Sequence, residues 1–296
     1  MIKKIKPYMM PIAITVGAIF YKTFDKLSFL TPYLIFVMLF LTYCNLKMND
    51  IRLSKLHAWM ISIQLLGSLA VYFLLAPFNV ILAQGAMICI LAPTGTAAPV
   101  ITGMLKGDVA SVTAYSLLSN MSVALAAPII FSFIGSYQTM PFIDSLCTIS
   151  QKVMFLLLTP FLIAFVLSRF TPKVTETIGR YSGLSFYIWS LALCVVAGRT
   201  MSFIIKQSNS NHLIEILIAV AAFVVCAGQF LIGRKIGSRY DKTVAGGQGL
   251  GQKNTILAIW MAQTYLNPIA SIGPGAYVLW QNIVNSYQVW LKRKSL

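Results

Sequence analysis

The chain has 296 residues, of which 58% are hydrophobic and only 10% are charged. Soluble globular domains have about a quarter of their residues charged, so this composition excludes that class and predicts an all-α integral membrane protein. The net charge of +16 suggests nucleic acid as a partner, but no basic face with interleaved aromatic residues lies outside the apolar segments, so we expect none.

Ten apolar stretches follow one another along the chain, each suited to a helix of about 20 residues that crosses the hydrocarbon core of a membrane. They lie near residues 8–22, 28–46, 57–76, 79–104, 108–135, 153–169, 183–204, 212–233, 245–266 and 269–291. The first follows the basic sequence KKIK, as a secretory signal would, but no small-residue cleavage site comes after it. We therefore expect it to be a retained membrane helix.

The lysines and arginines predict the orientation of these spans. Most of the 23 Lys and Arg residues fall in segments that would share one side of the membrane with the N-terminus. By the positive-inside rule, both termini are expected in the cytoplasm, with the protein in the cell inner membrane.

The fourth and ninth spans have sequences that are unusual for a membrane helix. The fourth contains APTGTAAP, residues 92–99, and the ninth contains GGQGLGQKNTI, residues 246–256. A proline inside a helix costs about 3 kcal/mol, and a glycine costs about 1 kcal/mol relative to alanine. We therefore expect both helices to be broken and to cross, as broken helices do at the substrate sites of several secondary transporters. The alternative is an ordinary bundle with close-packed glycines and kinks.

The longest break between spans, residues 135–152, separates five spans from another five. Because five is odd, the second half would enter the membrane upside down relative to the first. The sequence therefore predicts two inverted five-helix repeats, residues 1–138 and 139–296.

The cysteines and histidines do not predict a metal site. The five cysteines show no CxxC or other ligand spacing, and His57 and His212 fall at span edges on opposite sides. We expect both histidines to be interfacial, and we expect no metal and no cofactor.

Three motifs, in the order in which they occur, resemble those of the bile acid:sodium symporter family. They are PTGTAAPVITGMLKGDVA (Pro93–Ala110), KNTILA (253–258) and GPGAYVLWQNIVNS (Gly273–Ser286). The resemblance implies a panel domain of helices 1, 2, 6 and 7 and a core domain of helices 3–5 and 8–10, with helices 4 and 9 crossed in the core. It also implies alternating-access transport of organic anions, from small carboxylates to bile acids, usually with sodium.

The sequence departs from the family pattern where sodium would bind. The family's Ser-Asn pair, whose oxygens bind sodium, corresponds to Ala98 and Pro99, and an acidic residue of its ninth helix corresponds to Gly249. The glutamine of that helix corresponds to Lys253, or to Gln252 if one residue is inserted. The polar residues that remain in this cation-site region are Gln64, Ser116, Ser119 and Asn120.

Lys253 is the basic residue expected deepest in the membrane, where a lysine is costly unless it is paired or hydrated. We hypothesise that its ammonium takes the place of a sodium ion, held by backbone carbonyls of the broken helices, or that it carries a coupling proton. The alternative is that it extends into a water-filled crevice.

The resemblance also assigns the substrate contacts and the backbone of the crossing. The expected substrate contacts are Thr96, Asn254, Gln281 and Asn282. The expected crossover backbone includes Pro93, Gly95, Gly249 and Gly251. Gln281 and Asn282 have an alternative role as a hydrogen-bonded pair between helices.

These observations predict a carrier of organic anions whose sodium coupling is altered or lost. We expect no enzyme activity, because no paired carboxylates, Ser/His set or metal ligands lie within the spans, and no GxxxxGK[ST] motif binds ATP. The alternatives are a non-transporting receptor with the same fold and a conventional sodium symporter. The expected partners are a small organic anion and the lipid bilayer, with no obligate protein partner and no nucleic acid.

Overall fold

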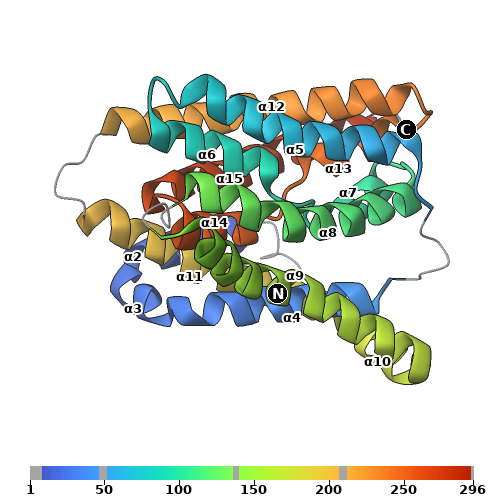
Figure 1. The fold of residues 1–296 in the computed structure, drawn as a ribbon. Helices are drawn as coiled ribbons and strands as arrows, with labels where there is room; N and C mark the ends of the chain where they lie inside the picture. The colour runs from blue at the N-terminus through green and yellow to red at the C-terminus, as the bar shows by residue number, and fades with distance from the viewer. Residues whose placement is uncertain (1–8, 47–51, 136–139, 207–211, 295–296) are drawn as a thin grey trace. The chain divides into compact units, whose positions relative to one another are not determined.

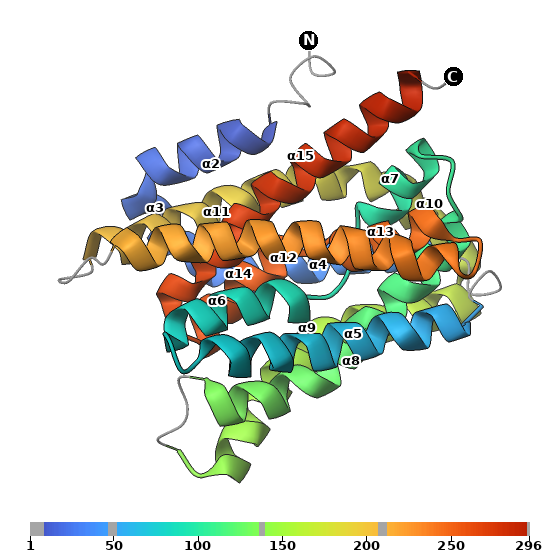
Figure 2. The same ribbon diagram turned by 90° about the horizontal axis from the view of Figure 1, so that it is seen from above.

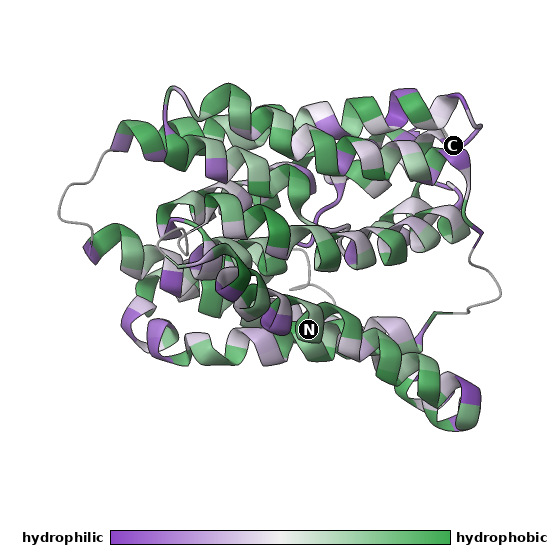
Figure 3. Cartoon of the chain, in the orientation of Figure 1, coloured by the Kyte–Doolittle hydropathy of each residue, from purple (hydrophilic) through white to green (hydrophobic). Residues whose placement is uncertain are grey.

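The structure, a computed structural model, describes residues 9–46, 52–135, 140–206 and 212–294. In these residues the secondary structure is helical, with no β-strand (Figure 1). Six helical stretches are long and apolar enough to cross a membrane: Tyr21–Cys44, Lys55–Leu75, Val109–Ile134, Phe142–Phe170, Ser185–Lys206 and His212–Ser238. Hydrophobic residues predominate along the helices, while hydrophilic residues gather at helix ends and connections (Figure 3). These are the features of an all-α, multi-pass membrane protein.

The chain divides into two compact units, each built from two separate parts of the sequence. Unit 1 comprises Met1–Leu46 and Lys152–Asn211, and unit 2 comprises Lys47–Gln151 and His212–Leu296. The predicted boundary between inverted repeats at residue 138 lies in the segment 136–139, outside the described residues, and the repeats remain a prediction.

Unit 1 contains the helices α2 (Met9–Ile19), α3 (Tyr21–Lys26), α4 (Thr31–Cys44), α10 (Pro172–Arg180), α11 (Ser185–Lys206) and most of α9 (Phe142–Phe170). Helix α11 packs along α2 and α3. Gly17 permits this approach, because a Cβ at that position would lie 2.5 Å from the carbonyl oxygen of Cys194. At the other end of the contact, Asp25 accepts hydrogen bonds from Ser202 Oγ at 2.7 Å and from Lys206 Nζ at 2.8 Å.

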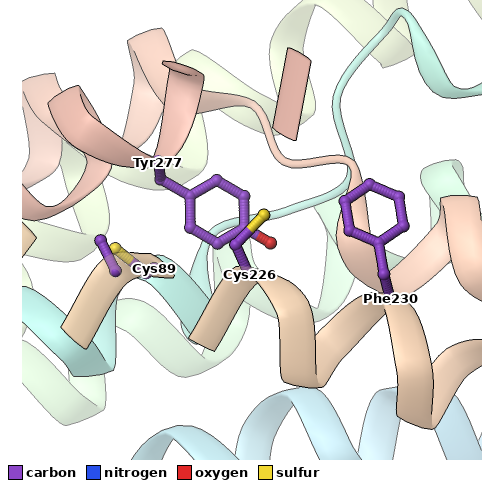
Figure 4. Packing of buried hydrophobic residues seen from close by; sticks show 5 residues of the cluster. Cys89, Cys226, Phe230 and Tyr277 are labelled. Carbon is purple, nitrogen blue, oxygen red and sulfur yellow. The ribbon is translucent and has the colours of Figure 1, made fainter. Parts of the chain in front are cut away.

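Unit 2 contains α5 (Lys55–Leu75), α6 (Val80–Leu91), α7 (Ala98–Met104), α8 (Val109–Ile134), α12 (His212–Ser238), α13 (Thr243–Gly251), α14 (Thr255–Tyr265) and α15 (Ile272–Lys294). Helix α6 packs against both α5 and α12, and α13 folds back along α12 (Figure 2). One part of its core consists of Cys89, Ala222, Cys226, Phe230 and Tyr277, from α6, α12 and α15 (Figure 4).

Two helices of unit 2 are interrupted, which confirms the breaks expected in the fourth and ninth spans. Helix α6 ends at Leu91 and α7 begins at Ala98, with Pro99 in its first turn, a position that tolerates proline. Helix α13 ends at Gly251 and α14 begins at Thr255.

The second break, residues 252–254, lies within the stretch 246–256 where it was expected, but the glycines of that stretch are not part of it. Gly246, Gly247, Gly249 and Gly251 all lie within α13. They are used for close packing instead. A Cβ on Gly246 would clash with the backbone carbonyl of Gly233 in α12, and a Cβ on Gly233 would clash with that of Gly246.

The break expected over residues 135–152 is also shorter than the sequence indicated. Helix α9 begins at Phe142 and runs without interruption to Phe170. Asp144 lies in its first turn, where a carboxylate interacts favourably with the positive end of the helix dipole. Polar residues before the apolar core of the span therefore extend the helix rather than end it.

Candidate functional site

The two interruptions in unit 2 meet through their backbones. Thr94 and Lys253 form an isolated antiparallel β-bridge. Two hydrogen bonds flank it, from Gly95 N–H to Gln252 O and from Asn254 N–H to Pro93 O, each 2.8 Å long. A Cβ on Gly95 would lie 2.7 Å from the carbonyl oxygen of Lys253, so glycine is needed there. Hydrogen bonds between the breaks thus replace bonds that the helices have lost.

The Lys253 side chain reaches the end of the other interrupted helix. Lys253 is 2% exposed, and its ammonium donates to the carbonyl oxygens of Ile90 at 2.8 Å and Ala92 at 3.0 Å. These carbonyls lie at the C-terminus of α6, where the last carbonyl groups have no N–H partner within the helix and where the helix dipole is negative. The ion pairs found among the described residues do not include Lys253. Its positive charge is therefore stabilised by carbonyl dipoles.

Thr94 makes the reciprocal contact. Its hydroxyl donates to the carbonyl oxygen of Gly249 at 2.8 Å, and Tyr277 donates to that of Gly251 at 2.8 Å. Both carbonyls belong to the last turn of α13. Lys253 therefore caps α6, which ends shortly before Thr94, and Thr94 caps α13, which ends shortly before Lys253.

The backbone N–H groups of both bridge residues are bound by side chains of neighbouring helices. The Thr94 N–H donates to Ser119 Oγ of α8 at 3.2 Å, and the Lys253 N–H donates to Gln281 Oε1 of α15 at 2.9 Å. Gln281 also donates weakly to the Lys253 carbonyl, at 3.4 Å. Ser119 of α8 thus holds the backbone at Thr94, and Gln281 of α15 holds the backbone at Lys253.

Two glutamine–tyrosine pairs surround the bridge. Gln64 of α5 donates to Leu91 O at 2.8 Å and to Ala92 O at 3.0 Å, and its Oε1 accepts from Tyr115 and Ser119, each at 2.8 Å. Gln229 of α12 donates to Cys89 O at 3.2 Å and to the Tyr277 hydroxyl at 3.0 Å. Figure 4 shows Tyr277 beside Cys226 in this region. Because Gln64 Oε1 accepts two hydroxyl groups, its NH₂ group must point to the carbonyls at the end of α6.

The expected substrate contacts lie in or near the two interruptions and on α15, and their side chains have different partners. Asn254 is 7% exposed, and its side chain caps α14 by accepting from Leu257 N–H at 3.3 Å. Gln281 binds the backbone of Lys253, as described above, whereas Asn282 donates to Val278 O of its own helix at 2.6 Å. Thr96 is half-buried in the segment before α7.

The expected cation-site region is only partly assembled. Ala98 packs against Val112 and Ala245, so hydrocarbon surrounds a position that was expected in the cation site only from the resemblance. Asn120 donates to the Ser116 backbone carbonyl at 2.8 Å, within α8, and its Oδ1 is buried with no hydrogen-bond partner. Gln252 accepts from Asn285 of α15. Three residues of the predicted polar set are linked: Ser119 donates to Gln64, and Gln64 and Lys253 both donate to the Ala92 carbonyl oxygen.

Sequence reasoning missed Thr94, Tyr115, Tyr277 and Gln229 as members of this network. One signal was present, since Tyr115 and Ser119 are one helical turn apart in α8, as Tyr277 and Gln281 are in α15. It also missed an amide cluster, in which Gln248 donates to Asn285 Oδ1 at 2.9 Å and to Gln288 Oε1 at 3.3 Å.

His57 is buried within the protein, and its expected position at the membrane interface stays a prediction. His57 is 1% exposed, because its ring packs beside Tyr115 and both of its nitrogens have hydrogen-bond partners. His212, by contrast, is exposed and pairs with Glu215 at 3.1 Å.

Asp108, just before α8, forms an ion pair with Lys242 at 2.9 Å. Its other oxygen accepts from the Ser111 N–H at 2.9 Å, which caps α8. Partial burial favours the neutral carboxyl, but the hydrogen bonds from Ser111 and Lys242 outweigh it, so the pKa of Asp108 lies below its ordinary value.

The arrangement around the bridge is a polar network in which a lysine ammonium is held by carbonyl oxygens. Within the described ranges, no group of three or more His, Cys, Asp or Glu residues is placed to hold a metal ion. No family model matches the chain, and a comparison with curated proteins also found no match.

Proposed function

We propose that this protein is a secondary carrier of organic anions that works by alternating access, with the Lys253 ammonium in place of a coupling sodium ion. The observation that carries the proposal is the buried ammonium at the end of α6, bound to two backbone carbonyls with no ion pair to a described carboxylate. Carbonyl oxygens are ligands that a hard cation also uses. An ammonium there stabilises the same carbonyl dipoles as a metal ion would, without an ion from solution.

The matched contacts support an inverted repeat around this site. Thr94 and Lys253 cap each other's helices, Ser119 and Gln281 bind their N–H groups, and each half contributes a glutamine–tyrosine pair. In each half the glutamine is in the helix before the interrupted one, and the tyrosine is in the helix after it. This equal order is what duplication and inversion of a five-helix unit produce.

The division into two units supports movement of one part of the molecule against the other. Unit 2 contains the interrupted helices and the polar network, and unit 1 contains two of the six long apolar helical stretches entirely and most of a third, Phe142–Phe170. In this proposal unit 2 is the transporting core and unit 1 the panel. The substrate binds beside Thr96, Asn254, Gln281 and Asn282, with both termini in the cytoplasm and the protein in the inner membrane.

The first experiment measures the thermal stability of the purified protein with a series of organic anions, each in sodium chloride or potassium chloride at equal ionic strength. A ligand that binds the folded state raises the melting temperature. We expect stabilisation by one class of anion that is equal in sodium and potassium. Stabilisation that needs sodium would contradict the role of Lys253 and indicate a conventional symporter.

Two variants test the lysine directly. Lys253→Ala leaves the carbonyls of Ile90 and Ala92 without the ammonium, so we expect a lower melting temperature that sodium raises again. Lys235→Ala, which removes an exposed lysine of α12, is the matched control and should show no such sodium effect. Anion uptake into proteoliposomes then separates a carrier from a receptor, since a receptor binds the anion but does not transport it.

A further inference from the structure

His57 is a buried titratable residue that the network around Lys253 does not use. It lies in the first turn of α5, with 1% of its surface exposed. Its Nδ1 is 3.1 Å from the backbone N–H of Ser54, and its Nε2 is 2.9 Å from Ser111 Oγ in the first turn of α8. The ring therefore joins the beginnings of two long helices.

The hydrogen bonds determine which ring nitrogen carries the proton. The Ser54 N–H can only donate, so Nδ1 must accept and has no proton. In a neutral imidazole the proton is then on Nε2, which donates to Ser111 Oγ. The Ser54 side chain in turn accepts from the backbone at the third position of α5, which completes a capping box with His57 in the place that Glu or Gln usually occupies.

Protonation of His57 would disrupt this arrangement. An imidazolium has an N–H at both nitrogens, so Nδ1 could no longer accept, and the Ser54 N–H would face another donor. The added charge would also lie at the positive end of the α5 dipole. The folded protein thus favours the neutral ring.

The groups that face His57 from neighbouring elements connect it to α13. Among the described residues, Lys242 and Asp108 are the charged groups that interact electrostatically with the ring, and Tyr115 of α8 stacks beside it at a centroid distance of 6.3 Å. Tyr240, after α12, packs against the adjacent cluster that contains Leu56.

The Asp108–Lys242 ion pair connects the surroundings of His57 to the start of α13. Asp108 binds both Ser111 N–H, next to the His57 contact, and Lys242, which immediately precedes α13. An imidazolium at His57 would compete with Lys242 for the Asp108 carboxylate and repel the Lys242 ammonium. Val244 of α13 also lies against Gly107 in the turn before α8. Weakening the Asp108–Lys242 ion pair would therefore also loosen the contact between α13 and this turn.

We propose that His57 is a proton-binding site that controls how α13 is attached: the neutral ring holds the starts of α5, α8 and α13 together, and proton uptake releases them. Since α13 leads directly to Gln252 and Lys253, proton uptake changes the support of the interrupted helices. The inference does not depend on what the protein carries, because its tests measure stability, accessibility and the state of the ring.

The sign of the pH effect follows from the hydrogen bonds. The unfolded chain takes up a proton on histidine at a pH of about 6.5, while the folded chain resists it, so stability is full above that pH and falls as the pH decreases. The lowered pKa of Asp108 produces a separate loss of stability in more acidic solution, near or below pH ~4.

His57→Gln is the informative variant, because glutamine at this position of a capping box accepts from the Ser54 N–H but does not titrate. In the wild-type protein we expect the melting temperature to fall by about 2–4 °C between pH 7.5 and 5.5, the shift expected from a loss of about one hydrogen bond in a protein of this size. The His57→Gln variant should show no such fall. His212→Gln removes the other histidine and should behave as the wild type does. An equal fall in His57→Gln and wild type would overturn the proposal.

Attachment of α13 is measured with Val244→Cys, whose thiol should react faster with a maleimide at pH 5.5 than at 7.5, and equally at both pH values when His57→Gln is added. In case His57→Gln does not fold, NMR of labelled histidine in His212→Gln leaves a single ring to observe. We expect a neutral ring with its proton on Nε2 at pH 7.5. A proton on Nδ1 would overturn the proposal.

Discussion

Ser119 accepts the hydrogen bond of the Thr94 backbone N–H. Thr94 lies outside any helix, and its N–H donates to Ser119 Oγ, which itself donates to Gln64. Ser119→Ala would remove both bonds and leave a buried donor unpaired, at a cost of about 1–3 kcal/mol. We therefore expect a clearly lower melting temperature for this variant.

The control for this prediction is Ser116→Ala, one turn earlier on the same helix. The side chain of Ser116 is half-buried, and its substitution should change stability by less than about 0.5 kcal/mol. Equal melting temperatures for the two variants would contradict the role assigned to Ser119.

At the scale of single residues, the sequence identified those that are rare in a membrane but not their partners. Lys253 could be selected because a lysine in an apolar span is costly unless it is stabilised. Thr94 and Tyr277 could not, because threonine and tyrosine occur widely in membrane helices. The partner of the Thr94 hydroxyl lies 155 residues away in the chain, and a single sequence contains no signal for such a contact.

At the scale of elements, the contact between α12 and α13 depends on glycine. Gly233 of α12 and Gly246 of α13 face each other so closely that a Cβ on either would clash with the backbone of the other. Gly233→Ala must push the helices apart, and overpacking of this kind costs about 1–3 kcal/mol. We expect a lower melting temperature and weaker attachment of α13.

Gly228 supplies the matched control, since it lies on the same helix and a Cβ added there would have no atom of a neighbouring helix within 4 Å. There, alanine gains helix propensity of about 1 kcal/mol, so Gly228→Ala should leave the melting temperature unchanged or raise it. If both variants lowered it equally, the effect would come from the backbone and not from packing.

The same contact explains why the glycines of the stretch 246–256 are helical although the second break lies in that stretch. Glycine weakens an isolated helix, which was the reason to expect an interruption within residues 246–256. In the folded protein, each glycine lets a neighbouring helix come nearer, and α13 stays helical until Gln252. Tertiary packing thus outweighs local propensity, whereas at Pro93 the missing N–H and the steric clash of the ring allow no such compensation.

At the scale of the whole molecule, composition alone was enough to predict an all-α membrane protein. The grouping of helices could not be obtained from spans in chain order, because both units combine an early and a late part of the chain. Only the resemblance to a family pointed to such a grouping. The sequence of each span shows how apolar that helix is, but not which other helix it packs against.

The interrupted helix α13–α14 provides a test of the topology. The two parts have 9 and 11 residues, so neither alone spans a hydrocarbon core about 30 Å thick, whereas together they reach about 30 Å at 1.5 Å per residue. We therefore predict that they cross the membrane as one span. With α15, this makes two crossings between Arg239 and Lys294, which places these two residues on the same side.

Single cysteines at exposed positions measure this directly, in a background where Cys147 and Cys194, the two cysteines that are not buried, are replaced by alanine. A membrane-impermeant maleimide applied to intact cells should label His212→Cys, at the start of α12, without further treatment. Arg239→Cys and Lys294→Cys should be labelled only after the membrane is permeabilised, because in the proposed topology α12 crosses to the cytoplasmic side and the next two spans return the chain to that side. Labelling of Lys294→Cys in intact cells, with Arg239→Cys protected, would mean that α13 and α14 enter and leave on one side, and the two-repeat topology would then be wrong.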